Sequence, residues 1–281
     1  MTARETPGLV FLCVLCVFCG PDALLSPADA QTLGVLDRGT IEIGVSASEL
    51  GGKVGVDGSA GSLGTDIDLS RDLDVAGRDS SRLLALRWRP FERHEFGARA
   101  QRYGRQGDKT INRDIVFDDE VFTINSRVKG EINLDVWSVE YIGWVLANEQ
   151  RALGLSVGAL QYRLGLKLAV ENLPGGAQTE PVDAQVSGDL PVAVLGAEYR
   201  ERLGEHWRLV MRAAVFKAKI NHIDGTVYDF NAGIESGLTE HATRAVRSAG
   251  ARLDAQTTRD DLTGRLHLDL TGLQAALIWR W

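Results

Sequence analysis

Apolar and polar residues alternate with a period of two along many segments of this chain. In "WRLVMRAAVF", Trp207, Leu209 and Met211 share one face of an extended backbone, and Arg208 and Arg212 share the other. Successive side chains of a β-strand point to opposite faces, so the pattern predicts a strand with one apolar and one polar face. The same alternation is present in "GTIEIGVSA", "RLLALRWRP", "DVWSVEYIGWV" and "VAVLGAEYR". We therefore predict an all-β fold.

The connections between these segments fall into two classes that alternate along the chain. The short ones lie around 89–95, 146–151, 201–207 and 237–242. The long polar ones lie near 48–80, 104–130, 171–190, 218–227 and 256–264. An up-and-down transmembrane barrel has tight turns at one end and loops at the other, whereas the Greek-key crossings of a soluble sandwich mix both lengths.

The pattern therefore predicts a single transmembrane antiparallel up-and-down β-barrel of about ten strands. Eight or twelve strands remain as alternatives, and the ninth segment, "TRAVRSAGARLDAQ", has the most ambiguous faces. The predicted strands are 39–47, 80–90, 94–104, 130–146, 151–169, 190–200, 206–219, 227–237, 242–256 and 264–281.

Tryptophan placement supports the same architecture. Trp88, Trp144 and Trp207 each lie within about three residues of a short turn, and Trp279 and Trp281 end the chain. Indole rings favour the interface between membrane and water, where the ring is apolar and its N–H stays hydrated. We predict that these five tryptophans form an interfacial belt at one end of the barrel.

The final segment, "GLQAALIWRW", places Trp281, Trp279 and Leu277 on one face, with Ile278 as an exception on the other. A last strand that closes a barrel presents apolar residues to lipid and pairs with the first strand, leaving no open edge. This ending resembles the C-terminal signature of Gram-negative outer-membrane proteins. The resemblance implies an outer-membrane location and recognition of the tail by the barrel-assembly machinery.

At the level of architecture the chain resembles the small outer-membrane barrels of the OmpA and OmpW types. The stretches "GTDIDLSRDLDV" and "RWRPFERHEFGARAQRYGRQG" are similar to an uncharacterised proteobacterial set within that group. The resemblance implies outer-membrane lipid and lipopolysaccharide as partners. It implies no activity, because a fold does not specify a function.

The first thirty residues are typical of a cleaved export signal. The apolar run "GLVFLCVLCVFCG" is too short to span a membrane as a helix, and Ala28-Asp29-Ala30 provides a small-x-small cleavage site. We expect residues 1–30 to be the signal peptide and 31–281 to be the barrel domain. Cys13, Cys16 and Cys19 all lie in the signal, so the mature domain has no cysteine.

Charge excludes one further class of partner. Removal of residues 1–30 takes away one arginine and three acidic residues, so the net charge of −7 becomes −5 over 251 residues. A mildly acidic chain of this kind has no basic footprint for nucleic acid. The sequence leaves the oligomeric state open.

The polar faces of the predicted strands carry charges of both signs. In a barrel of about ten strands they would point into a lumen narrower than that of a porin. We expect them to pair across a mostly closed interior, because an unpaired buried charge is costly. A narrow, anion-preferring pore is the alternative. The candidate lumen residues are Glu42, Arg87, Arg89, Arg99, Glu140, Glu198, Arg200, Arg208, Arg212 and Arg280.

The acidic stretch "GTDIDLSRDLDVAGRD" could gather carboxylates for calcium, but it departs from the EF-hand pattern. Arg71 stands where that pattern requires glycine, and Gly77 stands where it requires glutamate. We interpret the stretch as a solvated loop or strand extension and predict no metal and no cofactor.

Catalytic chemistry has one weak candidate. His222 and Asp224 fall in a predicted outer loop, where barrel proteases of the omptin kind carry an Asp–His pair, but here the order is reversed. Because the rest of that motif is missing, we assign no catalytic residue. The function predicted is structural or surface-interactive: envelope integrity, adhesion or binding through loops. A narrow channel for small solutes is the first alternative, and an outer-membrane hydrolase of protease or lipid A-modifying type is the second.

Overall fold

The computed structural model describes most of the predicted barrel domain. The described residues are 33–56, 65–74, 77–112, 114–117, 120–122, 125–170, 183–220, 223–259 and 262–281. The predicted signal peptide at 1–30 and His222 lie outside them. Within the described ranges every regular element is a strand. No helix in this part of the chain has the length and apolar character needed to cross a membrane.

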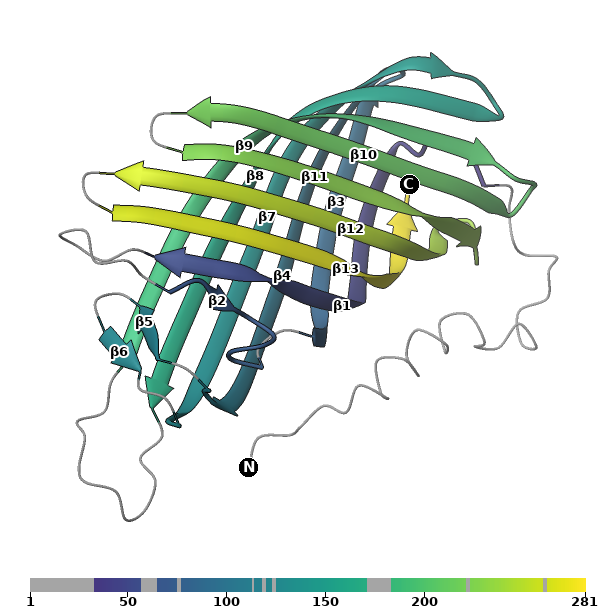
Figure 1. Cartoon of the computed structure of the whole chain (residues 1–281). Coiled ribbons are helices and arrows are strands. Elements are labelled where there is room, and N and C mark those ends of the chain that lie inside the picture. The colour runs from purple at the N-terminus through teal and green to yellow at the C-terminus, as the bar shows by residue number, and fades with distance from the viewer. Residues whose placement is uncertain are drawn as a thin grey trace.

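Ten long strands form one closed antiparallel barrel (Figure 1). Each pairs with its neighbours along the chain, and β13 pairs back with β1 from Thr40↔Arg280 to Val56↔Gly264. This confirms the predicted up-and-down barrel. The ten strands are β1 (Gly39–Val56), β3 (Gly77–Phe91), β4 (His94–Thr110), β7 (Arg127–Ala147), β8 (Arg151–Val170), β9 (Asp183–Arg202), β10 (Trp207–Ile220), β11 (Ile223–Gly237), β12 (Ala242–Arg259) and β13 (Leu262–Arg280).

Three short strands lie outside this ladder. The two-residue β2 (Ile67–Asp68) pairs with Lys53 and Val54 of β1, just beyond the point where β3 stops pairing with β1. A separate hairpin is formed by β5 (Ile115–Phe117) and β6 (Glu120–Phe122).

The two ends of the barrel differ. The connections at 92–93, 148–150, 203–206 and 238–241 lie at one end, called here the short-turn end. Both Gly39 and Trp281 lie there, and two backbone hydrogen bonds join them. The amide of Gly39 donates to the Trp281 carbonyl at 3.2 Å, and the Trp281 amide donates to the Gly39 carbonyl at 3.1 Å. The opposite end, called the loop end, carries β2, β5 and β6 (Figure 1).

The strands reach farther toward the loop end than the sequence predicted, and two of the predicted long loops are wrong. Only 221–222 separates β10 from β11, and only 260–261 separates β12 from β13. These two connections were predicted at 218–227 and 256–264.

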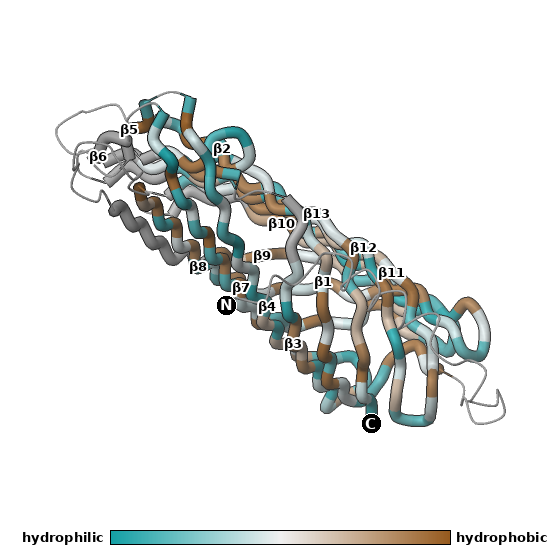
Figure 2. The backbone as a smooth tube through the Cα atoms, turned by 90° about the horizontal axis from the view of Figure 1, so that it is seen from below, coloured by the Kyte–Doolittle hydropathy of each residue, from teal (hydrophilic) through white to brown (hydrophobic). Residues whose placement is uncertain are grey.

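Along strand β7 the apolar and polar residues exchange faces. Near the short-turn end Trp137 and Val139 face outward and are exposed, whereas toward the loop end the outward positions are polar, as at Asn133 and Asp135. The inward positions change in the opposite direction, from Glu140 to Leu134 and other apolar residues. Figure 2 shows brown and teal residues alternating along the strands.

The outward apolar residues form a band around the half of the barrel nearer the short-turn end. This apolar band includes Ile43, Leu84, Leu86, Val139, Leu155, Val157, Leu195, Val215, Phe230, Leu273 and Leu277, all exposed. Exposed apolar surface of this extent on a closed barrel is the surface that lipid covers. The loop-end half has a polar exterior and an apolar core, as a soluble barrel does.

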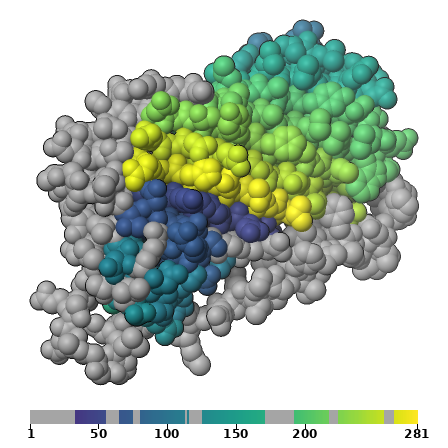
Figure 3. All heavy atoms as spheres, in the orientation of Figure 1, coloured from purple at the N-terminus to yellow at the C-terminus, as the bar shows by residue number. Residues whose placement is uncertain are grey.

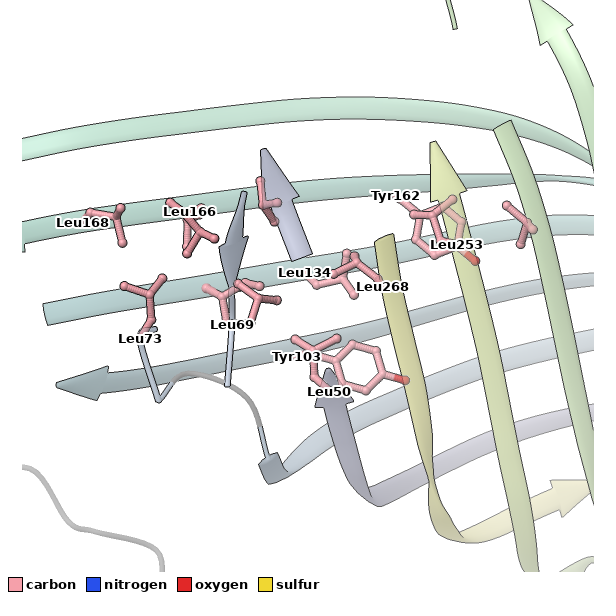
Figure 4. Packing of buried hydrophobic residues seen from close by; sticks show 14 of the residues in the cluster. Leu50, Leu69, Leu73, Tyr103, Leu134, Tyr162, Leu166, Leu168, Leu253 and Leu268 are labelled. Carbon is pink, nitrogen blue, oxygen red and sulfur yellow. The ribbon is translucent and has the colours of Figure 1, made fainter. Parts of the chain in front are cut away.

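The apolar core of the loop-end half is completed by the segment 65–74, called here the plug. Its residues Ile67, Leu69 and Leu73 are fully buried inside the barrel. In Figure 4, Leu69 and Leu73 lie among Leu166, Leu168 and Leu134 of the wall. The prediction that the acidic stretch is solvated is therefore wrong for the plug, because the aliphatic side chains of Ile67, Leu69 and Leu73 among its acidic residues fill the lumen.

The acidic residues of the plug shape its turn. The Asp72 carboxylate is buried and accepts a hydrogen bond from the Asp68 amide at 2.9 Å and from Arg71 Nε at 3.0 Å. The Asp68 carboxylate in turn accepts from the amides of Ser70 and Arg71. Within the described ranges no group of three or more histidine, cysteine or acidic residues could hold a metal ion.

Candidate functional site in the barrel interior

All ten predicted lumen residues lie on inward faces of the barrel. Glu198, Arg200, Arg208 and Arg212 are almost fully buried. Arg89 is at the short-turn rim, where its Nε donates to the Asp37 carbonyl at 3.0 Å. Most of the ten belong to two clusters of ion pairs in the half of the barrel that carries the apolar band.

The first ion cluster joins opposite walls of the barrel. The Arg87 guanidinium on β3 donates to both oxygens of Glu198 on β9, each at 3.0 Å, and to Glu95 Oε1 at 2.8 Å. Arg200 Nη2 lies 2.8 Å from the same Glu95 oxygen and 2.7 Å from Glu198 Oε1. Each carboxylate is therefore shared by two arginines.

Glu140 and Arg212 extend the first ion cluster. Arg212 Nη2 lies 2.8 Å from Glu140 Oε2, and Arg87 Nη2 lies 3.6 Å from Glu140 Oε1. The cluster thus contains three arginines and three glutamates from β3, β4, β7, β9 and β10. Equal numbers of opposite charges in direct contact are the arrangement that makes buried charges tolerable.

The second ion cluster lies beside the first and closes the short-turn mouth. Arg208 Nε donates to Glu235 Oε2 at 2.9 Å, and Arg208 Nη2 lies 2.8 Å from Asp37 Oδ2. Arg247 bridges Glu235, at 2.6 Å, and Glu42. Arg280 Nη1 completes the cluster at 3.9 Å from Asp37 Oδ1, so three arginines again face three carboxylates.

The segment 33–38 lies across this mouth. Arg208 Nη1 donates to the carbonyls of Gly34 and Val35, and the Leu33 amide donates to the Glu205 carbonyl at 2.7 Å. Leu33 and Val35 are buried, and Val35 packs in one apolar cluster with Trp144. An arginine of the barrel wall therefore holds the chain that precedes the first strand.

Trp144 is a correction to the predicted tryptophan belt. Its side chain is 1 % exposed and points into the barrel, where the Arg200 guanidinium lies 4.8 Å from the ring centroid and Nε1 donates to Glu95 at 3.3 Å. Trp144 lies seven residues after the outward Trp137, and an odd separation along a strand puts it on the inward face. The other four predicted interface tryptophans, Trp88, Trp207, Trp279 and Trp281, are exposed.

Four residues of the clusters were missed in the sequence. Glu95 lies four residues before Arg99 on one strand, so the strand period indicates that they share the inward face. Glu235 and Arg247 lie on β11 and β12, whose faces were left unassigned or ambiguous. Asp37 precedes the first strand, where no alternation exists to indicate its position.

Two small cavities remain in the interior, of about 60 Å³ and 50 Å³. Both are lined by Arg99, Arg212 and Asn231, so they adjoin one another beneath the plug. Arg99 Nη2 donates to Gln101 at 3.0 Å and to Gln274 at 3.4 Å. Polar cavities of this size hold a few water molecules. They do not form a wide channel.

The comparisons with known proteins concern the fold alone. No family model matches the chain, and no curated protein matches it. Among solved structures, the outer-membrane protease OmpT from Escherichia coli aligns with a TM-score of 0.58 at 13% sequence identity, covering 86% of this chain and 96% of OmpT. The fold is that of an outer-membrane β-barrel.

Two further barrels align less well. The toluene transporter TodX of Pseudomonas putida gives a TM-score of 0.33 at 8% identity, covering 87% of this chain and 89% of TodX. The attachment invasion locus protein Ail of Yersinia pestis gives 0.29 at 10% identity, covering 85% of this chain and 99% of Ail. A shared fold at such low identity assigns no function to this chain.

The catalytic candidate gains no support from the geometry. Asp224 is exposed on the outward face at the loop end of β11, in register with Gln256. His222 lies outside the described residues.

One histidine that the sequence did not single out does have carboxylate partners. His267 on β13 faces outward beyond the apolar band, with Nδ1 bonded to Asp254 and Nε2 at 2.9 Å from Asp269 Oδ2. Arg252 Nε donates to Asp269 Oδ1 at 2.7 Å. The hydrogen bond to Asp254 and then the charges of both carboxylates raise the pKa of His267 above its ordinary value. Two carboxylates beside the imidazole thus favour its protonated form.

Proposed function

We propose that the protein is a closed, non-conducting barrel of the bacterial outer membrane, exported with a cleaved signal, with a structural or surface-interactive role. One observation carries the proposal: the described residues fill most of the lumen and leave only small cavities between them. The plug and its apolar partners occupy the loop end, the ion clusters cross the middle, and segment 33–38 covers the short-turn mouth. Because a barrel without a passage cannot transport by diffusion, its role rests on its surfaces.

The loop-end half supports a role at the cell surface. It rises beyond the apolar band, and its exterior carries ion pairs such as Arg102 with Asp135 and Arg252 with Asp269. In outer-membrane barrels the loop end faces outward and the short turns face the periplasm. Residues just beyond the band would then lie at the depth of the phosphates and sugars of lipopolysaccharide, which we propose as a partner.

The C-terminal strand supports a second proposed partner, the barrel-assembly machinery. Trp279, Leu277 and Leu273 face outward and are exposed, and the chain ends on the exposed Trp281 beside Gly39. Such a strand is apolar on one face and open to pairing until β1 joins it. We expect replacement of Trp281 by aspartate to reduce assembled barrel in the outer membrane, measured by heat-modifiable mobility on gels.

Conductance of the refolded protein in a planar bilayer tests the proposed function. We expect no discrete steps, with a porin reconstituted in parallel to establish that the assay detects channels. Discrete steps whose anion preference changes in Arg87→Gln and Arg212→Gln would favour the channel alternative. Peptide or lipid A hydrolysis that is lost in His222→Ala would favour the hydrolase alternative.

A further inference from the structure

A wide shallow groove runs over the outer wall formed by β9 to β13, the wall that faces the viewer in Figure 3. Its volume is about 740 Å³. We call it the β9–β13 groove. The outward residues that shape it include Leu195, Val215, Tyr228, Phe230, Gly250 and Arg252.

The groove exists because small residues lie beside large ones across neighbouring strands. Phe230 of β11 is in register with Gly250 of β12, which is in register with Thr271 of β13. The Phe230 and Tyr228 rings are half exposed and stand above this floor. An apolar trough with an aromatic side wall, lying in the apolar band, has the shape and chemistry of a seat for an acyl chain.

The loop end of the groove is charged. Tyr228 is in register with Arg252, and Arg252 is in register with Asp269. The strands beside Tyr228 of the aromatic side wall therefore carry an ion pair. His267 and Asp254 lie one outward row farther along β13 and β12. Lys53 of β1 is exposed and in register with His267.

Arg252 is suited to hold an anion from the lipid side. Only its Nε is used in the bond to Asp269, and the side chain is 58 % exposed. A guanidinium can pair with a phosphate through its two remaining nitrogens, and the neighbouring Lys53 adds a second cation. The acyl trough and the cationic end thus match the two parts of a phosphorylated lipid.

We propose that the β9–β13 groove seats one acyl chain of lipid A and that Arg252 contacts its phosphate. The inference rests on the proposed outer-membrane location, because lipid A is the phosphorylated lipid of the leaflet that the loop end faces. It names the site on the barrel at which lipopolysaccharide binds.

The opposite wall provides the control. A second groove over β3, β4, β7 and β8 has a volume of about 360 Å³, roughly half that of the first, and is lined by residues such as Ala98, Trp137 and Ala159. The nearby residues Arg102 and Asp135 form an ion pair between strands in register, as Arg252 and Asp269 do, but they do not line the groove. Matched substitutions on the two walls therefore separate a specific seat from the general annulus of lipid.

Native mass spectrometry of the barrel, titrated with a deep-rough lipopolysaccharide, tests the proposal. We expect one saturable molecule per barrel, with Gly250→Leu weakening its affinity about tenfold because the leucine excludes about two methylene groups of the chain. Arg252→Ala should weaken it by a similar factor through loss of the phosphate contact. Ala159→Leu and Arg102→Ala should leave it unchanged.

Three results would overturn the inference: equal effects on both walls, no effect of Gly250→Leu and Arg252→Ala, or equal binding of phosphatidylethanolamine at the same site. Each variant is first checked for folding by heat-modifiable mobility. A wild-type protein that fails to insert into lipid would contradict the proposed function itself. Normal insertion with unchanged lipopolysaccharide affinity in the groove variants would contradict this inference alone.

Discussion

Trp144 combines three roles in one side chain. It fills space beneath segment 33–38, it lies against the Arg200 guanidinium, and it donates to Glu95 of the first ion cluster. A small apolar residue in its place would leave a void and withdraw contacts from two buried charges. The side chain thus links the apolar packing of the short-turn mouth to the electrostatics of the lumen.

We expect Trp144→Ala to lower the free energy of unfolding by about 3–5 kcal/mol, as for other buried aromatic residues. Trp144→Phe is the control, because it keeps an aromatic ring and loses the hydrogen bond and part of the buried volume, at a smaller cost of about 1–2 kcal/mol. Urea unfolding in lipid vesicles, followed by fluorescence, measures both. An alanine variant no less stable than the phenylalanine variant would contradict the placement.

The inward assignment of ten charged residues could be made from the sequence, because strand period fixes which residues share a face. Proximity to a turn misplaced Trp144, since a tryptophan near the interface can lie on either face, and the period decides which. Asp37 could not be found at all. Its contact with Arg208 depends on where the chain crosses the mouth, and no local pattern records that path.

His267 predicts a pH dependence outside the membrane. Its pKa is raised, so the protonated form is favoured by folding, and this contribution is present below the ordinary pKa and lost as pH rises through the higher folded value. We expect the unfolding midpoint of the wild type to fall, relative to His267→Gln, as the pH rises from about 6 through the raised pKa of His267. A constant difference across that interval would contradict the bonding of His267 to Asp254 and Asp269.

At the scale of the element, strand β1 changes partner along its length. It pairs with β3 as far as Leu50, and beyond that point the same edge receives the plug. Gly52 lies at the change with φ of +144°, and its carbonyl accepts from the Leu69 amide at 3.0 Å. A Cβ at Gly52 would lie 2.0 Å from the His267 carbonyl oxygen, so only glycine fits.

We expect Gly52→Ala to destabilise the loop-end half by about 1–3 kcal/mol, through backbone strain and collision with β13. Gly51→Ala is the neighbouring control, because a Cβ there meets no atom within 4 Å. Limited proteolysis reports the effect, since a displaced plug exposes the chain around 65–74 to cleavage. Equal protection of both variants would show that the plug does not depend on Gly52.

The sequence did not predict the full length of the strands. Alternation predicts a strand in either sense, but a transmembrane strand is identified by apolar outward residues, and beyond the apolar band the outward residues are polar. On β4 the change falls between the outward Ala100 and Arg102. At this level the surroundings of the barrel change from lipid to water. Outward residues change from apolar to polar and inward residues change from polar to apolar, while the strand itself continues.

At the scale of the whole molecule, the barrel is two differently solvated structures built on one set of strands. The membrane half has an ionic interior and an apolar exterior, and the loop-end half has an apolar interior and an ionic exterior. In each half the outward face matches the surrounding solvent, lipid or water, and the inward face has the opposite polarity. A membrane boundary must therefore cross the barrel at the level where the faces exchange.

Single cysteines on one face of β4 test that boundary. Residues 31–281 contain no cysteine, so in a protein that comprises these residues a thiol placed at Ala98 or at Gln106 is the only one present. Both positions face outward and are exposed. Ala98 lies on the membrane side of the level where the residue types exchange faces, and Gln106 lies on the loop-end side. In lipid vesicles we expect a water-soluble maleimide to label Gln106→Cys rapidly and Ala98→Cys at least tenfold more slowly, because about 26 Å of strand separates a hydrated site from one covered by acyl chains. In a detergent-free denaturant both thiols should react at one rate, which controls for intrinsic reactivity.

Rapid labelling of Ala98→Cys in vesicles would place that position in water and contradict the apolar band. Slow labelling of Gln106→Cys would extend the membrane over the loop-end half and contradict the two-solvent architecture.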